Sequence, residues 1–253
     1  VALWFDEPPT SKAYVDMTLG VLDRAGASAF WRDKGGLSAQ CNTPEGELGG
    51  FQMKIEPDAS SAGYWWCAPL VAPPGAACVP GFRRDALQGD VGVVEVLARL
   101  GAKVEWSPGL HGIRCPDGFT PSGEEIDLAL MPDAAMALSA VAALASGPTL
   151  LRGLRTLRVK ETDRVAALHA ELTRLGCAVR VDESPADIAL HISPLPRPLP
   201  AGDVIVHTYN DHRMAMGMAL VGLRRPGVII DHPACTAKTY PTFWRDLRSL
   251  YAS

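Results

Sequence analysis

The alternation of polar and apolar positions predicts a long amphipathic helix in the second half of the chain. Polar residues fill positions 160–164, and apolar residues with helical spacing follow them: Val165, Ala166, Leu168, Leu172 and Leu175. Thr162 and Asp163 offer capping oxygens at its start, and Gly176 is typical of a helix end. Lys160 and Arg164 would share one face of its first turns. We therefore expect an anion between these two cations, unless the segment is a solvated helix start with ordinary ion pairs.

The order of helices and strands recurs along the chain. Three expected helix ends share the sequence Leu-x-Arg-x-Gly, and three expected helix starts share an aspartate that leads into small and apolar residues. The glycines are spaced 75 residues apart and the aspartates 75 and 78 residues apart: Gly26, Gly101, Gly176, Asp58, Asp133 and Asp211. Units of this length indicate supersecondary blocks packed about a pseudo-symmetry axis rather than a solenoid.

Each unit is expected to contain a helix, a glycine stop, two strands joined by a turn, and a buried helix capped by aspartate. In the middle unit these elements fall at 90–100, 102–106, 111–115 and 133–145, with a further strand at 149–151. The buried helices are apolar around most of their circumference, which predicts a central position for 64–71, 134–145 and 214–223. A boundary near residue 57 would divide the chain into one unit, 1–57, and a body of three units, 58–253.

Composition and charge argue against several classes of function. The chain has 253 residues, 47% of them hydrophobic, and a formal net charge of −4, which argues against nucleic acid as a partner. Its apolar runs are too short to span a membrane. The six cysteines have no metal-like spacing, so we expect reduced thiols in a cytoplasmic protein and no metal.

Asp133 follows Pro132, and two interpretations of this aspartate remain open. The first is a simple cap of the next helix, because proline favours an extended backbone before it. The second is a carboxylate, held at a helix start, that accepts a proton from a substrate hydroxyl.

Two further polar segments carry candidate chemistry. In 210–214, Asp211 is expected to cap a helix whose first turn contains His212 and Arg213, an arrangement suited to a phosphate or carboxylate. The segment 235–239 adds Lys238. Together with the segment around Arg164, these two segments supply cations that converge, as well as proton-transfer groups. Because the cations repel one another, we expect that the site needs a polyanionic ligand to be tolerable. The residues indicate an anionic-substrate site with acid and base groups.

At this point the sequence resembles the 5-enolpyruvylshikimate-3-phosphate (EPSP) synthase family. The resemblance rests on segments that occur in the family's order along essentially the whole chain: 11–16, 58–61, 87–90, 132–136, 157–164, 209–216 and 235–241. It implies an α/β fold, an enolpyruvyl transferase-like inverse α/β barrel built of repeated βαβαββ units with central buried helices. It also implies transfer of the enolpyruvyl group of phosphoenolpyruvate to the 5-hydroxyl of shikimate 3-phosphate, with release of phosphate and without a metal or organic cofactor.

The resemblance assigns roles residue by residue. Asp133 would hold the attacking hydroxyl and take its proton, and Glu161 and Lys238 would transfer protons at the methylene carbon. His212 is a further candidate catalytic residue, near the bound phosphoenolpyruvate. Phosphoenolpyruvate would be bound by Arg164, Arg213 and Lys238. Shikimate 3-phosphate would be bound by Ser11, Tyr14, Asp133, Thr156 and Lys160. Thr156 departs from the family, which commonly has Asn there, so the amide of that contact is missing.

Family members are considerably longer than this chain, which resembles their C-terminal portion. The resemblance therefore implies a further partner, the complementary N-terminal part, with residues 1–57 as the last repeat unit of a globe that is otherwise missing. Two alternatives remain: a non-catalytic anion-binding module derived from the family, and a protein similar to UDP-N-acetylglucosamine enolpyruvyl transferase.

Overall fold

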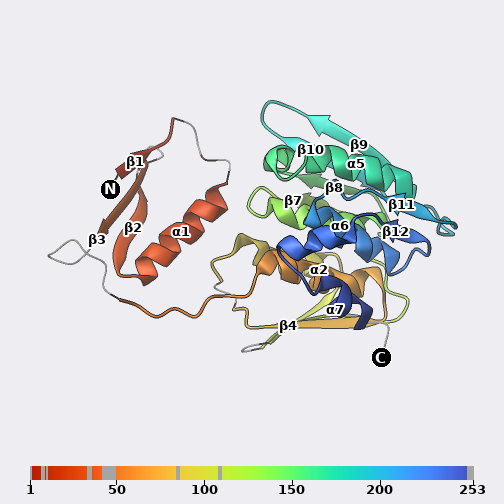
Figure 1. Cartoon of the computed structure of the whole chain (residues 1–253), viewed down its shortest axis with the longest axis horizontal. Helices are drawn as coiled ribbons and strands as arrows, with labels where there is room; N and C mark the ends of the chain where they lie inside the picture. Colours follow the sequence, from red (N-terminus) through yellow and green to blue (C-terminus); the bar gives the residue numbers. More distant parts are fainter. Residues whose placement is uncertain are drawn as a thin grey trace.

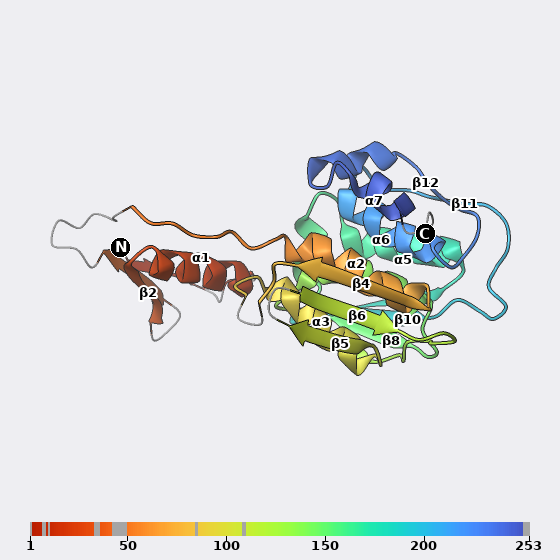
Figure 2. The ribbon, with the colours of Figure 1, turned by 90° about the horizontal axis from the view of Figure 1, so that it is seen from below.

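The computed structural model describes residues 2–6, 9, 11–32, 36–41, 50–83, 86–107 and 110–249. A small N-terminal lobe and a larger lobe lie side by side, and the extended segment before α2 connects them (Figures 1 and 2). None of the described helices combines the length and hydrophobicity that a membrane crossing requires. The assignment of residues 1–57 to an incomplete globe remains a prediction.

In the described residues of the small lobe, one helix packs on an antiparallel three-stranded sheet of order β1-β3-β2. Its elements are β1 (Ala2–Trp4), α1 (Lys12–Arg24), β2 (Ala27–Arg32) and β3 (Gly36–Cys41). Gly26, with φ of 89°, adopts the left-handed conformation that allows the chain to leave α1 and enter β2 at once. The N-terminal end of α1 points toward the larger lobe, which brings Tyr14 close to it (Figure 1).

The larger lobe contains two main sheets and one strand pair. The first sheet is antiparallel, of order β4-β6-β5: β4 (Gly75–Pro80), β5 (Lys103–Ser107) and β6 (Leu110–Cys115). The second has the order β7-β8-β10-β9, and only β7 and β8 run parallel: β7 (Glu125–Asp127), β8 (Thr149–Arg152), β9 (Ala178–Glu183) and β10 (Ile188–Ser193). The parallel pair is β11 (Val204–Val206) with β12 (Val228–Ile230).

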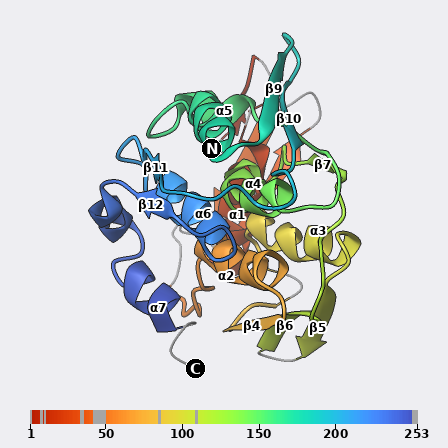
Figure 3. The ribbon, with the colours of Figure 1, turned by 90° about the vertical axis from the view of Figure 1, so that its right-hand side faces the viewer.

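Three helices form the centre of this lobe, as their apolar circumference predicts. They are α2 (Ala59–Val71), α4 (Ala135–Ala143) and α6 (His212–Gly222), which contact one another and are almost entirely buried (Figure 3). Gly217 permits a close approach of α6 to α4, because a Cβ there would lie only 2.5 Å from the carbonyl oxygen of Met136. The outer helices are α3 (Val93–Arg99), α5 (Arg164–Leu175) and α7 (Phe243–Ser249).

Most of the predicted helix boundaries are confirmed. Asp58 accepts a hydrogen bond from the Ser60 amide at 3.0 Å, and Asp211 accepts one from the Arg213 amide at 2.8 Å. Asp163 caps α5 in the same way, and Gly176 ends it with φ of 109°. Because α5 begins at Arg164, the expectation that Lys160 and Arg164 share a helix face is wrong; Lys160 ends a preceding 3-10 turn, Arg155–Val159.

Candidate functional site

Asp133 lies just before the central helix α4. A 3-10 turn, Pro132–Ala134, precedes α4, and the residue at the N-terminal cap position is Ala134. The Asp133 carboxylate therefore caps no amide of the helix, and the interpretation of this residue as a simple cap is wrong. Its side chain is only 4% exposed, so its charge has to be balanced by groups inside the protein.

Four side chains from three segments surround this carboxylate. Arg164 Nη1 donates to Oδ1 at 2.8 Å, and Lys160 Nζ lies 3.6 Å from the same oxygen. Arg213 Nη2 lies 3.4 Å from Oδ2, and the Tyr14 hydroxyl donates to Oδ2 at 3.2 Å. Tyr14 belongs to the small lobe, so the carboxylate links both lobes.

Arg164 connects the segments 160–164 and 210–214 to Asp133. Its guanidinium is 1% exposed and, besides Asp133, it binds Asp211 through Nε (2.7 Å) and Nη2 (3.2 Å) and Glu161 through Nη2 (2.7 Å). A buried guanidinium is tolerable only when such bonds satisfy it. Arg164 is the first residue of α5, and its position therefore depends on three carboxylates that all lie outside that helix.

Glu161 joins the last of the predicted cations to this cluster. Lys238 Nζ donates to Glu161 Oε1 at 2.6 Å, and the lysine side chain is 57% exposed. Burial favours the protonated form of Glu161, but the hydrogen bond from Lys238 and the charge of Arg164 outweigh it and lower the pKa of Glu161 to about 2. Glu161 is therefore ionised at neutral pH.

The charges of this cluster nearly balance within the chain. Its four cations, Lys160, Arg164, Arg213 and Lys238, face three carboxylates, Asp133, Glu161 and Asp211, which leaves a net charge of +1 when all are ionised. The expectation that the cations need a polyanionic ligand to be tolerable is therefore wrong. The anion between Lys160 and Arg164 is the Asp133 carboxylate.

His212 is the first residue of α6 and is 3% exposed. Its Nδ1 has no hydrogen-bond partner among the described residues. Burial, followed by the charge of Arg213, lowers the pKa of His212, so that the imidazole is neutral at pH 7. It lies beside the cluster as an uncharged group.

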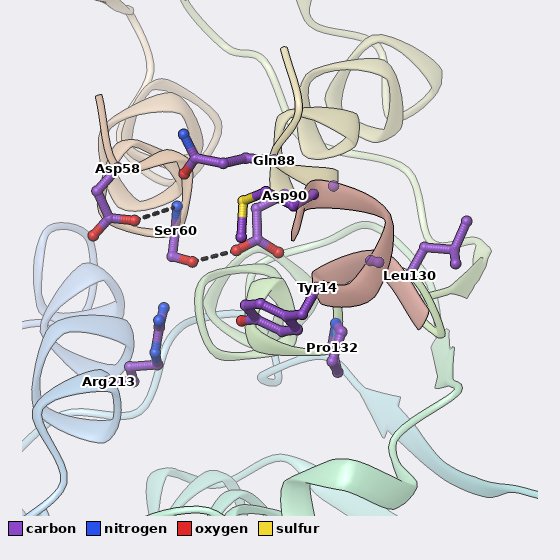
Figure 4. A pocket seen from close by; sticks show the side chains of 11 residues that line it. Tyr14, Asp58, Ser60, Gln88, Asp90, Leu130, Pro132 and Arg213 are labelled. Carbon is purple, nitrogen blue, oxygen red and sulfur yellow. Dashed lines mark hydrogen bonds between the residues drawn. The ribbon is translucent and has the colours of Figure 1, made fainter. Parts of the chain in front are cut away.

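A cavity of about 210 Å³ opens between the lobes next to this cluster. Tyr14 borders it from α1, and Arg213 borders it from α6 (Figure 4). The sequence analysis did not name its other polar lining residues, Asp58, Ser60, Gln88 and Asp90, as candidate site residues, although their segments carry the family resemblance. The Ser60 hydroxyl donates to Asp90, while burial raises the pKa of that carboxyl.

Two candidate residues lie outside this arrangement. Thr156, in the 3-10 turn before Lys160, borders a different cavity of about 370 Å³, and its buried hydroxyl has no partner among the described residues. Ser11 precedes α1 and makes no capping bond with its side chain. The structure thus gathers the four cations, Asp133, Glu161 and Tyr14 in one place, but not Ser11 and Thr156.

Comparison with known proteins gives a consistent result. The family model described as EPSP synthase (3-phosphoshikimate 1-carboxyvinyltransferase) matches residues 4–247. A 3-phosphoshikimate 1-carboxyvinyltransferase of Thiobacillus denitrificans is 38% identical over 237 residues, which cover 92% of this chain and 53% of that protein. A 3-phosphoshikimate 1-carboxyvinyltransferase of Neisseria gonorrhoeae is 37% identical over 244 residues, which cover 95% of this chain and 53% of that protein. The chain spans about half the length of the curated relatives it matches.

Solved structures agree on the fold. EPSP synthase from Acinetobacter baumannii has a TM-score of 0.75 at 24% identity, with 98% of this chain and 56% of that chain covered. The enolpyruvyl transferase NikO from Streptomyces tendae has a TM-score of 0.64 at 21% identity, with 91% and 51% covered. The fold is therefore the α/β enolpyruvyl transferase fold that the resemblance predicts.

Proposed function

Because this chain belongs to the EPSP synthase family, we propose that it is the C-terminal portion of an enzyme that transfers the enolpyruvyl group of phosphoenolpyruvate to the 5-hydroxyl of shikimate 3-phosphate. The observation that carries the proposal is the nearly buried Asp133 carboxylate, on which three cations from two segments and a hydroxyl of the other lobe converge. The family match favours this function over a relative of UDP-N-acetylglucosamine enolpyruvyl transferase.

Phosphoenolpyruvate would take the place of some of the internal carboxylate contacts. The resemblance assigns Arg213 and Lys238 to this substrate, and each has a single contact to this cluster, with side-chain exposures of 16% and 57%, so each could turn toward the substrate. Arg164 is held on three sides and would act as the fixed point of the anion site. Guanidinium groups suit the carboxylate and phosphate of this substrate because they bind such groups through two parallel bonds.

The Asp133 carboxylate would accept the proton of the attacking 5-hydroxyl, while the oxygen of that hydroxyl forms a bond to C2 of phosphoenolpyruvate. In the same addition the methylene carbon gains a proton, for which the Lys238 ammonium is the donor, because Glu161 is already ionised at neutral pH. Elimination then expels phosphate, and the methyl carbon loses a proton to the Lys238 amine or to Glu161. The neutral His212 would border the site without supplying charge.

Shikimate 3-phosphate would bind between the lobes. The Tyr14 hydroxyl now donates to Asp133 at 3.2 Å, the bond that a substrate hydroxyl would replace, and Lys160 lies 5.7 Å from the centre of the Tyr14 ring. Ser11 and Thr156 belong to this proposal through the resemblance, and they would have to approach the ligand from outside the present cluster. We also propose the complementary N-terminal part as a partner and the cytoplasm as the location.

The test is to measure phosphate release from phosphoenolpyruvate by the purified chain, alone and with the N-terminal half of a relative added as a second chain. We expect turnover at about 1–10³ s⁻¹, the usual enzyme range, only when both parts and shikimate 3-phosphate are present. Binding of phosphoenolpyruvate without turnover in any combination would instead support the non-catalytic anion-binding module. An absence of both binding and turnover would refute the proposal.

A further inference from the structure

Glu171 is a fully buried carboxylate that the proposed chemistry does not use. It lies in α5, is 0% exposed, and follows Arg164 by seven residues, which places both side chains on one face of the helix two turns apart. Glutamate is almost never buried completely unless it is paired. The partners of this carboxylate therefore indicate why it is there.

Three donors satisfy the Glu171 carboxylate, and two of them come from the segment between β11 and α6. Oε2 accepts a hydrogen bond from the His207 amide at 3.0 Å, and Oε1 accepts one from the Tyr209 hydroxyl at 2.7 Å. The third donor is Arg174 Nε of the same helix, at 3.0 Å from Oε2. Glu171 thus attaches α5 to the chain just before α6, and the two helices also contact each other directly.

The attached segment is a strained turn. Tyr209 and Asn210 have φ of 54° and 56°, in the left-handed region that residues with side chains seldom adopt. Such a conformation is strained and persists only where the surroundings hold it. Directly after this turn come Asp211, which caps α6, and Arg213, which borders the cavity.

We propose that Glu171 is a positioning residue for the anion site. By holding the Tyr209–Asn210 turn, it sets the direction in which the start of α6 presents Arg213. Arg164 binds Asp211 at the end of the same turn. Two residues of α5, Glu171 and Arg164, therefore hold this segment. The guanidinium groups of Arg164 and Arg213 are thereby held in a fixed position relative to each other. That the ligand is phosphoenolpyruvate rests on the proposed function.

Three variants separate this role from simple stability. Glu171→Ala leaves the His207 amide and the Tyr209 hydroxyl without their acceptor. Glu171→Gln keeps the turn, because the Gln oxygen accepts from the His207 amide while its NH₂ group donates to the Tyr209 oxygen. Leu168→Ala is the matched control, since it removes a fully buried side chain of the same helix that belongs to its apolar core.

Two measurements then apply. On the chain alone, amide hydrogen exchange should accelerate at 207–214 in Glu171→Ala more than elsewhere, whereas Leu168→Ala should show no selective change there. In the two-part enzyme, Glu171→Ala should raise KM for phosphoenolpyruvate about tenfold, the effect of about 1.4 kcal/mol, with little change for shikimate 3-phosphate. Glu171→Gln should restore both readouts toward the wild type.

The inference is overturned if Glu171→Ala gives the same exchange pattern and the same KM values as Leu168→Ala at equal loss of stability. It is also overturned if Glu171→Gln is as defective as Glu171→Ala. If exchange at 207–214 responds as expected but the two-part wild type makes no use of phosphoenolpyruvate, the hold on the turn is supported, and it is the proposed function that fails.

Discussion

Replacing Asp133 by Asn removes one charge and almost no volume from the centre of the site. The Asn side chain retains an oxygen that can accept from Arg164 Nη1, now 2.8 Å away, but it cannot take a proton from a hydroxyl. If Asp133 is the base, kcat should fall by about 10²–10⁴, the usual contribution of general acid–base catalysis. A purely structural carboxylate would leave kcat within a few-fold.

The same substitution should also lower the free energy of unfolding. Asn could replace Asp well as a helix cap, but here the carboxylate is an ion-pair partner, and Asn carries no charge. Asp133 is 4% exposed and contacts three cations, whereas the most buried of them, Arg164, keeps Asp211 and Glu161 as partners in the variant. Hydrogen bonds to charged groups contribute about 1.5–3 kcal/mol each, so we expect the free energy of unfolding to fall by about 1–3 kcal/mol. For a chain of this length that lowers Tm by roughly 2–10 °C.

The assay is kcat of the two-part enzyme at a temperature well below both melting transitions, with thermal unfolding measured in parallel. Leu138→Ala is the control: Leu138 is 1% exposed in α4, and its truncation should cost about 2–5 kcal/mol without touching the cluster. A control that is equally destabilised yet turns over normally would assign the loss in Asp133→Asn to chemistry. Near-normal turnover of Asp133→Asn would remove this residue from the mechanism.

Two further predictions concern stability. Because the pKa of Glu161 is lowered from 4.5 to about 2, its ion pairs should stabilise the folded chain above pH 4.5, and this contribution should disappear as the pH falls toward 2. Urea unfolding of wild type and Glu161→Gln should therefore differ at pH 7 and converge near pH 2; a constant difference would contradict the shift. Gly217→Ala should cost about 1–3 kcal/mol by overpacking against the Met136 carbonyl, and an unchanged Tm would show that α4 and α6 can separate freely.

Local patterns predicted the central helices because each is apolar on nearly all sides, and they predicted α5 because capping and glycine residues mark both of its ends. They did not reveal β7, whose three residues alternate polar and apolar over too short a span to stand out. They also placed Lys160 in the helix, since nothing local distinguishes a 3-10 turn from the first turn of an α-helix.

The candidate site was predictable as a set of cations but not as a charge-balanced cluster. Arg164 and Asp211 are 47 residues apart, and Arg164 and Asp133 are 31 apart, so their pairing is a product of tertiary structure that no periodicity encodes. The role of Glu171 was invisible for the same reason. A glutamate on an amphipathic helix suggests a solvated residue, whereas two of its three partners lie 36 and 38 residues further along the chain.

The close approach at Gly217 has a consequence for how this protein can change over evolutionary time. Asp133 and Arg213 stand at the N-terminal ends of α4 and α6, and the backbones of these helices touch where position 217 has no side chain. The distance between these two candidate site residues therefore depends on how the two helices pack in the core. A new side chain at this one interior glycine would therefore shift Asp133 and Arg213 relative to each other, although neither residue lies beside position 217.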